Sequence, residues 1–117
     1  MKNFTYTITQ KKDYFIVSIK GRIMNDESIT ILLADVVIAL EQNSNVILDL
    51  EKLDYLNSSG LNCLITILTK SRIKGGETII TNIQEPINKL LLISKLNSVF
   101  EIRATVEEAM NEFLLVK

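Results

Sequence analysis

The stretch from Asn45 to Leu61 constrains the fold of this chain more than any other. It opens with an apolar run, Val46 to Leu50, which only Asp49 interrupts and which is typical of a buried strand. We interpret residues 51–56 as a connector that carries two apolar anchors, Leu53 and Leu56.

A helix start follows this connector directly. Asn57, Ser58 and Ser59 are all residues that cap helices, and they precede apolar residues at helical spacing (Leu61, Leu64, Ile65 and Leu68). The carboxyl end of a strand is where open α/β sheets place their sites. A helix N-terminus there offers free N–H groups and a positive dipole end, so a hydroxyl at this point is well placed to carry a phosphate.

The chain before this stretch predicts a hairpin and a helix. Aromatic and β-branched residues alternate with threonine over 4–9, and a second strand is expected from Tyr14 to Lys20 after a polar turn. Residues 21–26 are expected to leave that strand, with Asn25 or Asp26 capping a helix. That helix has an apolar stripe (Ile29, Leu32, Leu33, Val36 and Leu40).

The chain after this stretch alternates helices with strands. A helix over 59–73 ends before Gly75-Gly76, and Thr78–Thr81 is a strand. Pro86 suits the start of a third helix. A last strand is expected over Val99, Phe100 and Ile102, before a final helix that a capping box of Thr105 and Glu108 begins. The order β-β-α-β-α-β-α-β-α predicts an α/β fold with a single mixed β-sheet and packed helices, and we expect residues 1–117 to form one domain.

Composition excludes several classes of function. The chain has 117 residues, 47% of them hydrophobic and 23% charged, which is ordinary for a soluble globular domain. The net charge of −1 gives no basic surplus for nucleic-acid binding. The most apolar stretch, Ile29–Leu40, is too short to cross a membrane as a helix, and the N-terminus lacks a signal-peptide core. We therefore expect a cytoplasmic protein without direct membrane insertion.

The chain contains no histidine, which removes the commonest general base and the commonest metal ligand. The single cysteine, Cys63, cannot form an intrachain disulfide, and beside an apolar stripe it is expected to be a small packed residue. The Gly75-Gly76 pair does not fit a phosphate-loop pattern. These absences predict a protein that is not an enzyme and that holds neither a metal nor a cofactor.

The central stretch resembles the signature of the STAS domain (sulfate transporter and anti-sigma factor antagonist). The matching residues read Asp-Leu-Glu-Lys-Leu-Asp-Tyr-Leu-Asn-Ser-Ser-Gly-Leu over 49–61, against a family pattern of roughly D-L-S-x-V-x-x-I-D-S-S-G-L. The Gly75-Gly76-Glu77 turn and the segment Leu92–Leu96 followed by Val99-Phe100 also resemble the family. Three positions depart from it: Asn57 and Met24 stand where the family has aspartates, and Lys95 stands where it has a glycine.

The resemblance implies a regulatory binding module similar to an anti-sigma factor antagonist. Such a module binds an anti-sigma factor that is also a serine kinase, and phosphorylation ends the interaction. The serine that the family phosphorylates is Ser58 here, with Ser59 as the alternative acceptor. The implied partner-binding residues are Met24, Asn25, Asp26, Leu56, Asn57, Ser58, Ser59, Gly60 and Asn62. The expected assembly is a monomer or weak dimer.

Two alternatives remain open at this stage. From the residues alone, Asn57, Ser58 and Ser59 can be read as a helix cap and nothing more. Within the family, the loss of the aspartates at Asn57 and Met24 favours a different role, in which the domain is a fixed scaffold subunit of a lipid-transport ATPase complex or a signalling assembly.

Overall fold

The computed structural model describes residues 4–24 and 27–115. A five-stranded sheet with the order β1-β2-β3-β4-β5 runs through it. Strands β2 to β5 are parallel, and β1 is antiparallel to β2. The sheet is mixed, and the sequence of elements confirms the predicted order.

The elements are β1 (Phe4–Gln10), β2 (Phe15–Ile23), α1 (Glu27–Leu40), β3 (Val46–Leu56), α2 (Ser58–Ile73), β4 (Thr78–Thr81), α3 (Glu85–Ile93), a 3-10 turn (Leu96–Ser98), β5 (Glu101–Arg103) and α4 (Val106–Leu115).

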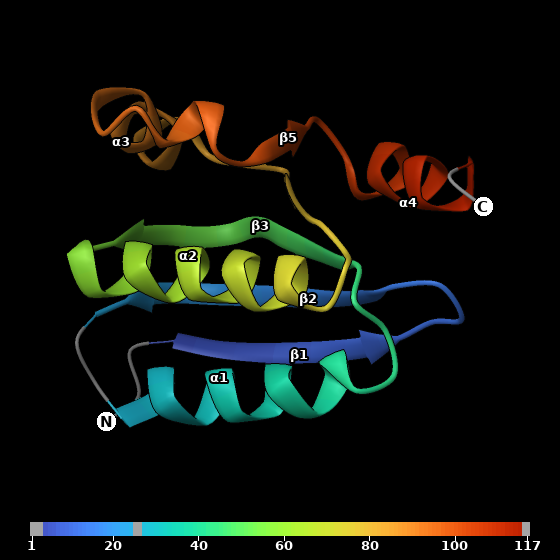
Figure 1. The fold of residues 1–117 in the computed structure, drawn as a ribbon. Coiled ribbons are helices and arrows are strands. Elements are labelled where there is room, and N and C mark those ends of the chain that lie inside the picture. Colours follow the sequence, from blue (N-terminus) through green and yellow to red (C-terminus); the bar gives the residue numbers. More distant parts are fainter. Residues whose placement is uncertain (1–3, 25–26, 116–117) are drawn as a thin grey trace.

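Helices cover the sheet unequally on its two faces. The larger core contains buried side chains of β1, β2 and β3, of α1 and α2, and of α3. The smaller core lies on the other face, where Ala109 and Phe113 of α4 pack against Tyr14, Ile47 and Ile79. In Figure 1, α1 lies beside the edge strand β1, and α2 crosses in front of the neighbouring strands. Central strand β3 is therefore buried from both sides at its start, which explains the apolar run Val46–Leu48.

Strand β3 is longer than the sequence predicted. Residues 51–56, which the sequence favoured as a connector, continue the strand and pair with β2 as far as Leu56 opposite Ile23. The register between β2 and β3 shifts twice, and each shift adds one residue to β3. Such bulges break the two-residue alternation, so that Leu50, Leu53 and Leu56 are buried at every third position. The anchors were recognised correctly, but the connector was a wrong prediction.

Two further strand boundaries differ from the expectation. Strand β2 does not end at Lys20 but continues to Ile23, because bulged β3 extends alongside it. Gly21 has a φ of 111°, a conformation that glycine adopts without cost at an irregular pairing. Strand β5 is shorter than predicted, because Val99 and Phe100 both precede it and only Ile102 of the three predicted residues lies in it. Val99 is 37% exposed, whereas Phe100 is buried.

The predicted helix boundaries agree closely with the structure. Helix α2 begins at Ser58, and α3 has its proline in the first turn, as expected of Pro86. The Thr105 backbone amide donates to the Glu108 carboxylate and the Glu108 backbone amide donates to the Thr105 hydroxyl, each at 3.2 Å, which confirms the capping box. The cap expected of Asn25 or Asp26 lies outside the described residues.

Candidate functional site

The candidate site lies where the carboxyl ends of β2 and β3 meet the start of α2. Ile23 and Leu56 are register partners at these ends, and the Asn57 amide donates to the Ile23 carbonyl at 3.1 Å. The chain turns from β3 into α2 with Asn57 as the only residue between them. The orientation of the first turn of α2 is therefore fixed by the ends of two central strands.

Asn57 is the N-cap of α2. Its side-chain oxygen accepts a hydrogen bond from the Gly60 amide at 3.0 Å, and its backbone is extended. Ser58 is the first helical residue and is exposed, whereas Ser59 is half-buried. No described residue forms a hydrogen bond with the Ser58 hydroxyl. Among the described residues, the capping hydrogen bond at the start of α2 is therefore made by Asn57, one of the three residues that the sequence identified as a helix cap.

Gly60 lets α2 sit directly on the strand ends. A Cβ added at Gly60 would lie 2.8 Å from the Cβ of Leu56 and 2.9 Å from the Cβ of Ile23, closer than such atoms approach in proteins. Gly60 itself is buried. The glycine therefore serves the close approach that places Ser58 at the surface immediately beside β3.

An apolar groove opens beside Ser58. It has a volume of about 410 Å³ and lies between the start of α2 and helix α3. Its lining comprises Tyr55, Leu56, Asn57, Ser58, Leu61, Pro86, Ile87 and Leu90. Leu56 and Ile87 are buried and form its floor, while Tyr55 is 41% exposed at its rim. A partner side chain that enters this groove would lie beside Ser58.

A cation also stands at this end of the sheet. The Arg22 guanidinium lies over the Tyr55 ring, 5.0 Å from its centroid, which is a cation–π arrangement. The first turn of α2 contains no acidic residue, so the positive end of its dipole is not neutralised within that turn. Ser58 consequently lies at the positive end of the α2 dipole.

The structure brings most of the predicted partner-binding residues together. Asn57, Ser58, Ser59 and Gly60 form the first turn of α2, and Asn62 is exposed in the next turn. Leu56 is only 2% exposed, so it supports the surface without presenting its side chain to a partner. Met24 is half-buried directly after β2, whose end lies beside that of β3. Asn25 and Asp26 lie outside the described residues.

The sequence reasoning missed the contribution of α3 and of Tyr55. Leu90 of α3 packs against the larger core, but it is only half-buried and also lines the groove. The signal that could have located the groove was topological. Strands β3 and β4 are neighbours, and each leads into a helix on the same face of the sheet, so α2 and α3 must begin side by side.

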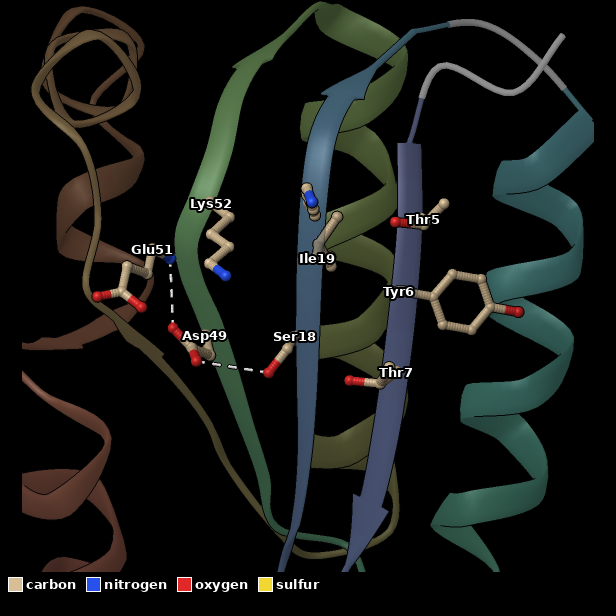
Figure 2. Close-up of a pocket in the computed structure, with 9 residues that line it drawn as sticks. Thr5, Tyr6, Thr7, Ser18, Ile19, Asp49, Glu51 and Lys52 are labelled. Atoms are coloured by element: carbon tan, nitrogen blue, oxygen red, sulfur yellow. Dashed lines mark hydrogen bonds between the residues drawn. The ribbon is translucent and has the colours of Figure 1, made fainter.

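A second hollow, on the open part of the sheet, is polar. Figure 2 shows its residues on β1, β2 and β3, with the Asp49 carboxylate between β3 and β2. Asp49 accepts hydrogen bonds from the Ser18 hydroxyl at 3.4 Å, from the Asn82 side chain at 3.1 Å and from the Glu51 amide at 3.2 Å. Because Asp49 already has these three donors within the protein, this hollow is a weaker candidate than the groove beside Ser58.

Cys63 is a packed side chain, as expected. It is 2% exposed in the larger core, and burial raises the pKa of its thiol to about 11. The thiol is therefore protonated at neutral pH, as suits a side chain packed in the core. Across residues 4–24 and 27–115, no group of three potential acidic, cysteine or histidine ligands gathers, and no helix is long and apolar enough to span a membrane.

Comparison with known proteins places this geometry in a family. The family model of the STAS domain matches residues 5–109. The chain belongs to the STAS domain family. The signature residues over 49–61 thus form the β3–α2 junction of a STAS domain, in which Ser58 is exposed at the start of α2.

Solved structures of STAS proteins share the fold. A phosphorylated form of the Bacillus cell fate determinant SpoIIAA is 19% identical, with a TM-score of 0.74 over 92% of this chain and 98% of that chain. An anti-sigma factor antagonist from Mycobacterium paratuberculosis is 19% identical, with a TM-score of 0.75 over 94% and 93%. A serine-to-glutamate variant of RsbS from Moorella thermoacetica is 15% identical, with a TM-score of 0.81 over 95% and 96%. At these identities the similarity concerns the fold.

Proposed function

We propose that this chain is an anti-sigma factor antagonist that binds an anti-sigma factor with serine kinase activity. In this proposal, phosphorylation of Ser58 by that kinase ends the interaction. The observation that carries it is the exposed Ser58 at the first position of α2, beside an open apolar groove of a STAS domain. The partner would supply the ATP, and this chain would hold no cofactor.

The position of Ser58 suits a switch that does not unfold the domain. A phosphate adds about −1.5 to −2 charges and three acceptor oxygens. On Ser58 these charges would lie near the free N–H groups of α2, with the neutral Asn57 as the neighbouring cap. The folded domain can therefore accept the modification at little cost.

The cost of the phosphate would fall on the complex. A partner that fills the groove lined by Leu61, Ile87 and Leu90 must cover the edge where Ser58 stands. Covering a phosphate removes it from water, which is strongly unfavourable unless the partner supplies compensating donors. One modification would thus break the complex and leave the domain intact. The contact surface would also include Met24, Asn25, Asp26, Asn57, Ser59 and Asn62.

Affinity purification from the native cell tests this proposal. Ser58→Ala and Ser58→Glu variants would be the baits, and Ser98→Glu, at another exposed serine, would be the control. We expect Ser58→Ala and the control to retain a protein with a kinase-type ATP-binding domain, and Ser58→Glu to lose it. Equal recovery of that kinase by all three baits would contradict the switch.

One specific observation favours a second candidate function. Asn57 and Met24 replace two aspartates of the family, so the serine lacks two carboxylates that a kinase partner would meet there. A domain without these carboxylates could instead be a fixed scaffold subunit of a lipid-transport ATPase or a signalling complex. Recovery of a transport ATPase by Ser58→Ala and Ser58→Glu alike would support this alternative.

A further inference from the structure

The outward side of α1 is apolar and uncovered. Ile31, Val37 and Ile38 are 52%, 39% and 61% exposed, and Ala34 between them is exposed as well. We call these four residues the outer face of α1. A helix that faces water on one side normally carries charged residues there. In Figure 1, no described element covers the side of α1 that is turned away from β1.

The only charged residue between the two ends of α1 is already engaged. Asp35 accepts a hydrogen bond from the Tyr6 hydroxyl across the seam between α1 and β1. Figure 2 shows the Tyr6 side chain pointing from β1 toward α1. The outer face of α1 and the edge strand β1 therefore form one continuous surface, with the Tyr6–Asp35 hydrogen bond between them.

Two hollows lie along this seam, one on each side of the Tyr6–Asp35 hydrogen bond. The first has a volume of about 410 Å³ and is lined by Phe4, Thr5, Ser28 and Ile31 in addition to the bonded pair. The second has a volume of about 300 Å³ and is lined by Ile8, Gln10, Ile38, Ala39 and Gln42 in addition to the pair. Each hollow thus has one exposed isoleucine of α1 at its border.

We propose that the outer face of α1 is a weak homodimer interface, in which two copies pack α1 against α1 in antiparallel orientation. A two-fold axis near Ala34 would place Ile31 of each copy over the hollow beside Ile38 of the other copy. It would likewise place Ile38 of each copy over the hollow beside Ile31 of the other. Ile31 and Ile38 are seven residues apart, about two helical turns or roughly 10 Å. In a two-fold contact, each patch must meet a copy of itself in the opposite direction. The two isoleucines and the two hollows satisfy this, because each isoleucine of one copy meets a hollow of the other.

Charges at the two ends of α1 agree with this orientation. Exposed Glu27 lies at the first turn, whereas exposed Lys11 and Lys12 lie near the last turn, where the Asn43 side chain donates to the Lys11 carbonyl at 2.8 Å. The antiparallel pair brings Glu27 of one copy toward both lysines of the other. Exposed Glu41 and half-buried Asp13 also lie at the lysine end, so the charges there balance, whereas Glu27 gives the other end a negative charge. A parallel pair would place Glu27 against Glu27, and the antiparallel pair avoids this repulsion.

The size of the patch sets the strength of the interface. A stable interface buries about 800 Å² on each partner, and four side chains of this size cover only part of such an area. We therefore expect association in the range of roughly 0.1–1 mM rather than an obligate dimer. In Figure 1, α1 and α3 lie on opposite sides of α2, so the dimer would leave the groove beside Ser58 open.

Analytical ultracentrifugation from micromolar to millimolar concentration tests the proposal. We expect a reversible monomer–dimer equilibrium, and we expect Ile38→Glu to weaken it at least tenfold. The matched control is Ile93→Glu, because Ile93 is 80% exposed but lies on α3. Thermal unfolding of each variant would verify that it folds. A monomer at every concentration, or equal weakening by the control, would overturn the proposal.

Charge exchange tests the antiparallel orientation separately. Glu27→Lys should weaken dimerisation, and adding Lys11→Glu and Lys12→Glu in the same chain should restore it, since the opposed charges are then exchanged. A dimer that Ile38→Glu breaks, but that the combined variant does not restore, would contradict the orientation. Neither experiment depends on Ser58 or its partner, so its failure would leave the proposed function untouched.

Discussion

At the scale of single residues, Lys95 adopts a conformation that suits another residue. Its φ of 63° lies in the left-handed region, which costs a residue with a Cβ roughly 1–2 kcal/mol, and the family has a glycine there. Glycine would remove this strain but would gain freedom in the unfolded chain, which costs roughly 0.5–1 kcal/mol. We expect Lys95→Gly to raise the free energy of unfolding by up to about 1 kcal/mol, measured by urea denaturation.

The matched control for this substitution is Lys89→Gly. Lys89 is an exposed lysine inside α3, where the helical backbone suits any residue except proline and glycine. Glycine there should lower the free energy of unfolding by roughly 1 kcal/mol. If both substitutions destabilised the protein equally, the left-handed conformation of Lys95 would not be the cause of any strain.

Cys63 gives the domain a defined dependence on alkaline pH. Its thiol pKa is raised by burial from 9.0 to about 11 in the folded chain, whereas the unfolded chain ionises near the ordinary value. A raised folded pKa contributes stability that is complete below pH 9 and is lost as the pH rises toward 11. The melting temperature of wild type should therefore fall further over this range than that of Cys63→Ala. Parallel curves for the two proteins would contradict the raised pKa.

At the scale of elements, the β3–α2 junction shows what local patterns can predict. The capping residues and the apolar spacing predicted a helix start within one residue of Ser58, because both signals are local. The course of residues 51–56 could not be read in this way. Two bulges bury Leu50, Leu53 and Leu56 at every third position, and a period of three belongs neither to a regular strand nor to a helix.

Asn57 should stabilise α2 through its cap and not through a charge. We expect Asn57→Ala to lower the free energy of unfolding by about 1 kcal/mol, because the Gly60 amide loses its acceptor. Asn57→Asp should keep the stability near neutral pH, since aspartate caps about equally well. Chemical denaturation of both variants would measure this. A loss with aspartate as large as that with alanine would contradict the capping role.

Gly60 reverses the usual effect of glycine in a helix. A glycine-to-alanine change inside a helix normally stabilises by about 1 kcal/mol. Here the new Cβ would meet Leu56 and Ile23 at under 3 Å, so the helix or the strand ends must move. We expect Gly60→Ala to destabilise the domain by roughly 1–3 kcal/mol, whereas Ser59→Ala should change stability by less than about 0.5 kcal/mol. A stable Gly60→Ala variant would show that the junction can relax.

At the scale of the whole molecule, the order of elements was predictable and the binding surface was not. Each helix and strand has its own sequence signal, such as the threonine alternation of β1 or the capping box of α4. The groove beside Ser58 depends on which strands are neighbours, and no local pattern states that. The sequence therefore proposed Ser58 through its resemblance to a family signature, whereas the contribution of Leu90 and Tyr55 to the groove required the structure.

A phosphate on Ser58 would change partner binding with little effect on the stability of the fold. Ser58 projects from a first turn that Asn57, Gly60 and the ends of β2 and β3 already hold in place. Ser58→Ala and Ser58→Glu should each change the free energy of unfolding by less than about 0.5 kcal/mol, as measured by chemical denaturation. A larger loss in the alanine variant would show that the Ser58 hydroxyl contributes to the fold itself.

Intact-protein mass spectrometry with peptide mapping would show directly whether Ser58 is phosphorylated, as the proposed switch requires. The protein would be purified from its native cell under several growth conditions. We expect a mass increase of one phosphate in at least one condition, on the peptide that contains Ser58, and no such increase in Ser58→Ala. An unmodified mass under every condition, or a phosphate on Ser59 alone, would contradict it.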